Sequence, residues 1–145
     1  MKTSIKGCAL SLLVLAAAAY GPSAAQSPSD ANSLLGSWSS PGVGNCPTAK
    51  NPGRPRMSPT SFTFTSVAAD GSFDGTFSVG CNGPSGSLDR DRKVAKVEGG
   101  AVVVKLTYGP NATYVYTFTP GGGSAPGEMV TPSGDRVATV FEFKK

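Results

Sequence analysis

Histidine is absent from the 145 residues of this chain, and that absence excludes more chemistry than any other feature of the composition. Without an imidazole there is no Ser-His or Cys-His pair to activate a nucleophile, no histidine general base and no histidine ligand for zinc. Most of the nine Asp and Glu residues fall in predicted turns or on polar strand faces, and they form no dense acidic loop of the kind that binds calcium. We therefore expect no enzyme activity, no cofactor and no metal site.

Long apolar runs are also scarce. The only one, Ala9–Ala19, follows a short basic head and precedes the small residues Ser23–Ala25, which is the pattern of a cleaved signal peptide. The run is about half the roughly 20 residues that span a bilayer, so we expect a secreted or periplasmic protein without stable membrane insertion. Residues 1–25 are the predicted signal peptide, 26–33 a disordered leader, and 34–145 a single domain.

Cysteine is rare as well. The chain has three, and removal of the signal peptide discards Cys8 and leaves Cys46 and Cys81. Two cysteines in an exported domain predict one disulfide, worth about 3 to 4 kcal/mol in the chain-entropy model. The net charge falls from +4 to +2 when Lys2 and Lys6 are removed, and the remaining basic residues are scattered. This balance does not indicate a nucleic-acid partner.

Glycine and proline, by contrast, are plentiful and gather in turns. Eight of them fall between Pro41 and Pro59, and this composition predicts a loop over the whole segment. A loop of this length in a compact domain is typical of a lid or a binding loop. It carries Lys50, Arg54 and Arg56 as candidate lid residues, and Cys46 is placed to anchor it.

Between the turns, apolar and polar residues alternate with a period of two, which predicts β-strands. Clear examples are 61–67, 73–79 and 101–108, and Asp70-Gly71 supplies a tight hairpin turn between the first two. About eight such strands follow one another, and no amphipathic helix is predicted after the signal peptide. We predict an all-β fold: a single antiparallel up-and-down β-barrel of about eight strands, with a β-sandwich as the alternative.

The segment Gly36-Ser37-Trp38 at the head of the first predicted strand resembles the Gly-x-Trp entry of lipocalin-like (calycin-type) proteins. The resemblance implies a barrel in which Trp38 plugs one end and a basic residue near the last strand, here Arg136, lies across it. It also implies a non-catalytic protein that binds a small apolar ligand.

Inward-facing aromatic side chains of the predicted strands are the candidate ligand-lining residues. They are Phe62, Phe64, Phe73, Phe77, Tyr114, Tyr116 and Phe118. The same side chains can instead simply fill a narrow eight-stranded barrel.

Two other functions stay open. One is a protein-binding module such as a periplasmic protease inhibitor, acting through the 41–59 loop or the 26–33 leader. The other is an envelope structural protein without a small ligand.

Overall fold

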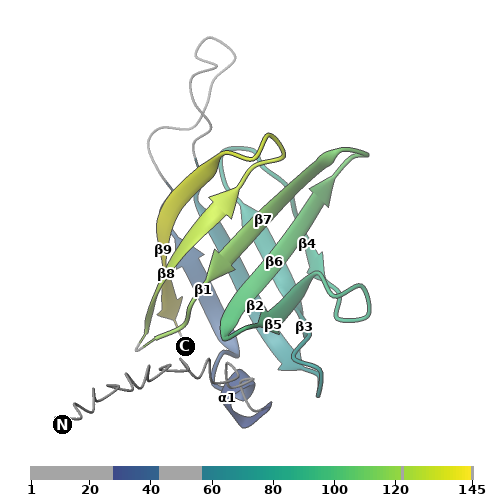
Figure 1. The fold of residues 1–145 in the computed structure, drawn as a ribbon, viewed down its shortest axis with the longest axis vertical. Coiled ribbons are helices and arrows are strands. Elements are labelled where there is room, and N and C mark those ends of the chain that lie inside the picture. The colour runs from purple at the N-terminus through teal and green to yellow at the C-terminus, as the bar shows by residue number, and fades with distance from the viewer. Residues whose placement is uncertain (1–27, 43–56, 122, 145) are drawn as a thin grey trace, which may run out of the picture.

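A nearly closed antiparallel barrel makes up most of the computed structural model, which describes residues 28–42, 57–121 and 123–144 (Figure 1). A short helix precedes the strands. In chain order the elements are α1 (Pro28–Asn32), β1 (Gly36–Ser40), β2 (Thr60–Val67), β3 (Phe73–Val79), β4 (Ser85–Leu88), β5 (Ala95–Glu98), β6 (Ala101–Tyr108), β7 (Ala112–Phe118), β8 (Ser124–Val130) and β9 (Arg136–Lys144).

All nine strands belong to one sheet in the order β4-β3-β2-β1-β9-β8-β7-β6-β5. Every pairing is antiparallel, and the last strand returns to the first, with Trp38 of β1 opposite Phe143 of β9. Neighbours in the sheet are therefore neighbours in the chain, apart from this closure. The predicted all-β up-and-down barrel is confirmed.

The strands β4 and β5 act as two halves of one interrupted strand. β4 pairs with the second half of β3, and β5 reaches the start of β3 through an antiparallel bridge between Ser72 and Lys96. Residues 89–94 form the loop between the two halves. Nine strands thus occupy eight positions around the barrel, which is the number that the sequence predicts. In the described part of the chain β5 pairs with β6 but β4 does not, so the barrel is nearly rather than fully closed.

Charged side chains hold the loop between β4 and β5 in place. The backbone N–H of Arg90 donates to Asp74 Oδ1 at 3.1 Å, and Arg90 Nε lies 3.3 Å from Asp74 Oδ2. Lys93 Nζ lies 3.5 Å from Asp70 Oδ2. The hydrogen bond from Arg90 is the main reason that the pKa of Asp74 is below its ordinary value. Such exposed pairs add little stability one by one, but together they fix where the strand resumes.

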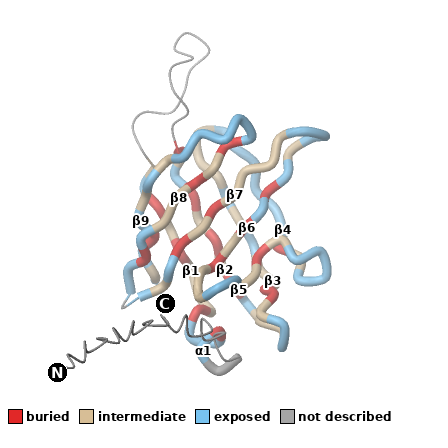
Figure 2. Tube along the Cα trace, in the orientation of Figure 1, coloured by how far each residue is buried: buried red, intermediate tan, exposed pale blue. Residues whose placement is uncertain are grey.

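The helix α1 covers one end of the barrel, which we name the α1 end (Figures 1 and 2). The sequence predicts a disordered leader over 26–33, whereas residues 28–32 are helical. Pro28 at the first helical position and Asp30 in the first turn both favour a helix there. Burial of Ala31 and Leu34 then attaches the segment to the barrel. No helix in the described residues is long and apolar enough to cross a membrane.

The opposite end of the barrel, which we name the loop end, carries the turns 80–84, 109–111 and 131–135. β1 finishes here and β2 begins here. The strand β8 starts at Ser124 and includes Pro126. Proline has no N–H to donate, but Pro126 lies opposite Thr119, just beyond the end of β7, so the missing hydrogen bond falls at the end of the ladder. Its carbonyl oxygen still accepts a hydrogen bond from the N–H of Thr119 at 3.0 Å.

Glycines beside a large ring allow the sheet to curve tightly around the α1 end. Gly36 of β1 and Gly75 of β3 both lie opposite Phe64 of β2, on its two sides. A Cβ atom at Gly75 would lie 1.8 Å from the carbonyl oxygen of Thr63, closer than any real contact. The register between β2 and β3 also shifts between Phe64 and Ser66, as in a β-bulge. Such glycines and bulges are the usual means by which a sheet bends into a barrel.

Candidate functional site

Five of the seven predicted lining residues are buried in the barrel interior: Phe62, Phe64, Phe73, Tyr116 and Phe118. Their rings contact one another. The ring centroids of Phe64 and Phe73 are 4.4 Å apart, and those of Phe62 and Tyr116 are 5.3 Å apart. Phe141 of β9 is also buried and joins them, with its ring centroid 4.6 Å from that of Phe118. These rings pack as an aromatic core, so a ligand at this depth would have to separate them.

The other two predicted lining residues, Phe77 and Tyr114, are only half-buried. Together with Val79, Tyr108 and Val137 they face inward near the loop end and pack on top of the aromatic core. We name these five residues the collar. The rings of Tyr108 and Tyr114 lie 5.5 Å apart between centroids, which makes them a continuous apolar wall. The collar is where the inner surface of the barrel is apolar and still partly accessible.

The collar contains a buried polar atom without a partner. The hydroxyl oxygen of Tyr108 is buried and makes no hydrogen bond with any described residue. Desolvation raises the pKa of Tyr108 well above its ordinary value of 10, and the nearby Tyr116 and Tyr114 raise it further. A buried hydroxyl that lacks a hydrogen bond typically costs about 1 to 3 kcal/mol. A bound molecule with an acceptor atom would remove that cost.

Tyr116 is buried below the collar, and burial also raises its pKa. A side-chain hydrogen bond with Thr60 partly offsets the shift. Both phenols therefore stay protonated in the folded protein at any pH near neutrality. A protonated phenol can donate a hydrogen bond, so Tyr108 is a donor at this site.

We expect the stability of the protein to fall as the pH rises above about 10. In the unfolded chain tyrosine ionises near its ordinary pKa, whereas folded Tyr108 and Tyr116 hold their protons because their pKa values are raised. The folded state then binds more protons than the unfolded state, so alkaline conditions favour unfolding, while stability below pH 10 is unaffected by these groups. Urea midpoints at about pH 9 and about pH 11 should differ less in the variant Tyr108→Phe/Tyr116→Phe than in the wild type. An equal alkaline loss in both proteins would contradict this assignment.

The Gly-x-Trp segment lies in β1, near the α1 end of the barrel. Trp38 is buried, its ring centroid lies 4.8 Å from Phe143 and 5.3 Å from Phe118, and its Nε1 donates to Leu34 O at 3.0 Å. A Cβ atom at Gly36 would lie 2.6 Å from the Phe143 ring, so the glycine makes room for that ring. Trp38 thus ties the end of the α1 segment to β1 and to the last strand.

Arg136 does not lie across Trp38. It begins β9 at the loop end, while Trp38 pairs with Phe143 near the other end of that strand. The Arg136 side chain is exposed on the outer face and forms an ion pair with Glu128. The physical reason is strand alternation: Val137, Phe141 and Phe143 point inward, so residue 136 must point outward.

Some of the predicted features lie outside the described residues. These are the signal peptide, the candidate lid residues Lys50, Arg54 and Arg56, and Cys46. The disulfide between Cys46 and Cys81 therefore stays a prediction. β3 ends at Val79, and Cys81 lies in the following turn with a φ of 60°.

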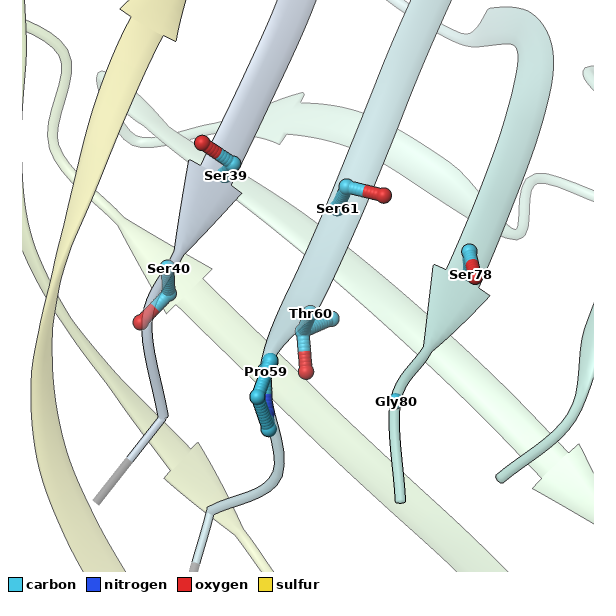
Figure 3. Close-up of a pocket in the computed structure, with 7 residues that line it drawn as sticks. All are labelled: Ser39, Ser40, Pro59, Thr60, Ser61, Ser78 and Gly80. Carbon is cyan, nitrogen blue, oxygen red and sulfur yellow. The ribbon is translucent and has the colours of Figure 1, made fainter. Parts of the chain in front are cut away.

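A hollow of about 230 Å³ lies at the loop end of β1–β3, where the outward residues Ser39, Ser61 and Ser78 meet the buried residues Ser40 and Thr60 (Figure 3). It is lined by Ser39, Ser40, Pro59, Thr60, Ser61, Ser78 and Gly80. The lining holds no charged and no aromatic side chain. Its hydroxyls can donate and accept hydrogen bonds, but none of these serines has a basic side chain beside it in the lining to make it a nucleophile. Within the described residues, no three His, Cys, Asp or Glu side chains come together as a metal site.

Sequence reasoning missed two parts of this arrangement. Tyr108 lies on the same face of its strand as Val104 and Leu106, so the sequence predicts that its side chain points inward. The sequence does not predict that its hydroxyl lacks a hydrogen-bond partner among the described residues. The hollow brings together Ser39, Ser61 and Ser78 from three strands. The outward direction of these three serines follows from alternation, whereas their meeting at one place depends on the strand register.

Comparison of the chain with profiles of known protein families, with curated proteins and with solved structures gave no match. The antiparallel, nearly closed barrel is compatible with the calycin-like fold that the Gly-x-Trp segment resembles. The function must therefore be argued from the geometry of the collar and of the outer face.

Proposed function

We propose that this protein is an exported, non-catalytic binding protein that holds a small, mostly apolar ligand at the loop end of the barrel. The observation that carries the proposal is the buried hydroxyl of Tyr108, which has no partner among the described residues and lies within the apolar collar. A few convergent polar groups in an apolar concave surface are the usual make-up of a small-molecule site. Export rests on the signal-peptide pattern of residues 1–25.

The collar defines the chemistry of the ligand. Phe77, Tyr114 and Val137 offer apolar contact, so the body of the ligand is apolar. Tyr108 is a protonated donor, so the ligand carries one acceptor such as a carbonyl or ether oxygen. The packed rings of the aromatic core lie directly below, so the ligand is small and binds near the rim rather than deep inside.

Titration with N-phenyl-1-naphthylamine, a neutral apolar dye that fluoresces on leaving water, tests this proposal. We expect saturable binding to the wild-type protein and at least about tenfold weaker binding to Tyr114→Ala, because the variant loses one large apolar contact. The control is Val140→Ala, which removes an exposed apolar side chain from the outer face and should bind the dye as the wild type does. No saturable signal, or equal binding by Tyr114→Ala, would contradict the proposal.

The role of Tyr108 can be separated from that of the apolar wall with two competitors of equal length. Decan-2-one has an acceptor oxygen, and decane has none. The ratio of ketone to decane affinity should be about 2- to 10-fold higher for the wild type than for Tyr108→Phe, because the variant leaves the ketone oxygen without a donor. If Tyr108→Phe keeps the full preference, the tyrosine hydroxyl is not the donor.

A further inference from the structure

Outward hydroxyl side chains on β1–β4 stand in two continuous rows that cross four strands in register. The first row is Ser37, Thr63, Thr76 and Ser87, and the second is Ser39, Ser61, Ser78 and Ser85. Each residue is the direct pairing partner of the next one in its row. We name these eight residues the hydroxyl rows.

Strand geometry makes the rows a regular grid. Neighbouring strands lie about 4.8 Å apart, and residues two positions apart on a strand are separated by about 6.8 Å. No charged side chain interrupts the eight positions. Charged side chains border the rows at two places: Lys144 and Glu142 on β9 pair with Ser37 and Ser39, and Asp74 on β3, two residues from Thr76, forms an ion pair with Arg90. The eight positions themselves are a neutral, evenly spaced set of hydrogen-bonding groups.

Most of these hydroxyls are available to a partner. Thr76, Ser78, Ser85 and Ser87 are exposed, and the other four are half-buried. Among the described residues, the one side-chain hydrogen bond within the rows joins Ser37 and Thr63 at 3.0 Å, and each of those hydroxyls still has capacity for another bond.

The hollow at the loop end takes three of its seven lining residues from the second row. Ser39, Ser61 and Ser78 are consecutive members of the second row, and all three line it (Figure 3). Pro59 and Gly80 border it at the loop end. The second row thus runs into a hollow of about 230 Å³, which offers a concave surface beside the exposed hydroxyls.

We propose that the hollow and the hydroxyl rows bind a neutral polysaccharide. A sugar chain presents hydroxyls that both donate and accept, as do serine and threonine, and it repeats at regular intervals as the rows do. One sugar unit occupies the hollow against Ser39, Ser61 and Ser78, and the following units lie along the rows toward β4. This site is separate from the collar and does not depend on the function proposed for it.

The same face is poorly suited to other partners. Nucleic acids and acidic polymers need Lys or Arg, and none lies in the rows. Protein interfaces concentrate their binding energy in Trp, Tyr and Arg, which are also absent from them. Single hydrogen bonds between exposed neutral groups add little, so affinity must come from many bonds made together. A long sugar chain should therefore bind more tightly than a short one.

Co-sedimentation of the mature full-length protein with cellulose, chitin and starch particles tests the proposal. We expect retention on at least one of them, at both low and high salt, because no charges are involved. The variant Ser61→Ala/Ser78→Ala should bind about tenfold more weakly, since it removes two adjacent hydroxyls from the hollow. The soluble oligosaccharide of the retained polymer should compete better as its length increases.

The matched control is Thr107→Ala/Thr113→Ala, another cross-strand pair of outward hydroxyls, which lies on β6 and β7 and joins at 3.0 Å. It should bind the polysaccharide as the wild type does, and thermal unfolding should confirm that both variants are folded. Failure to bind any of the three polymers would overturn the proposal. So would equal binding by Ser61→Ala/Ser78→Ala, or retention that high salt abolishes. None of these outcomes affects dye binding at the collar.

Discussion

Replacement of Gly75 by alanine is expected to destabilise the barrel by about 3 kcal/mol or more. The new Cβ atom would lie 1.8 Å from the carbonyl oxygen of Thr63, and that oxygen belongs to the neighbouring strand rather than to a flexible side chain. Relief of the clash requires β2 and β3 to move apart at the point where the sheet curves around Phe64. The loss is a large part of the 5 to 15 kcal/mol that typically stabilises a domain.

Two other glycines provide controls for this prediction. At Gly121 the nearest atom to an added Cβ is Ser124 O at 3.8 Å, so Gly121→Ala should stay within about 0.5 kcal/mol of the wild type. At Gly127 the Cβ would lie 2.6 Å from Thr117 O, so Gly127→Ala should fall between the two. Urea unfolding followed by circular dichroism measures all three. A midpoint for Gly75→Ala equal to that of Gly121→Ala would show that the strands do not approach as closely as described.

Replacement of Trp38 by alanine is expected to cost about 3 to 5 kcal/mol. The change removes a buried ring that contacts Phe143 and Phe118, and it deletes the hydrogen bond from Nε1 to Leu34 O. The cavity would open where β1 meets β9, which is the pairing that closes the barrel. Loss of Trp38 should therefore weaken the whole barrel rather than one end of it.

Trp38→Phe separates the two contributions, because it keeps an aromatic ring but not the donor. We expect it to lose less than Trp38→Ala while still being less stable than the wild type. Since Trp38 is the only tryptophan, its fluorescence disappears in both variants, and thermal unfolding must be followed by circular dichroism. If Trp38→Ala unfolded at the wild-type temperature, the tryptophan would not be part of the core.

The fold was largely predictable because burial in an antiparallel barrel leaves a period of two in the sequence. Residues 61–67, 73–79 and 101–108 place their large apolar side chains mainly at every second position, and each segment forms a strand. The interruption between β4 and β5 was harder to predict. Asp89 to Lys93 reads as a polar turn, and only its contacts with Asp70 and Asp74 on other segments show that the strand resumes on the same neighbour.

The helix α1 was missed because its order comes from tertiary contact. Five residues are too few to form a stable helix alone, and their composition is that of a loop. Ala31 and Leu34 become buried only when the barrel is present to receive them. The position of Arg136 was mispredicted for a different reason. Strand alternation places its side chain outward, whereas the lipocalin-like resemblance implies a side chain that lies across Trp38.

The candidate sites were predictable only in part. Alternation identifies which aromatics face inward, but not that Phe64 and Phe73 pack against each other while Tyr114 stays half-buried. For the hydroxyl rows the residues are visible in the sequence, yet the register that aligns Ser39, Ser61 and Ser78 is not. Register depends on turn geometry and bulges, and a shift by one residue would turn these serines inward.

Ligand binding at the loop end is tested most directly by an NMR titration of the ¹⁵N-labelled protein with N-phenyl-1-naphthylamine. We expect saturable shifts for the backbone amides of Tyr108, Tyr114 and Val137, and little change for Phe64 and Phe73 in the aromatic core. No saturable shift in the collar would contradict the proposed function. Shifts confined to Phe64 and Phe73 would contradict it as well, because they would place the ligand among rings that the structure packs together.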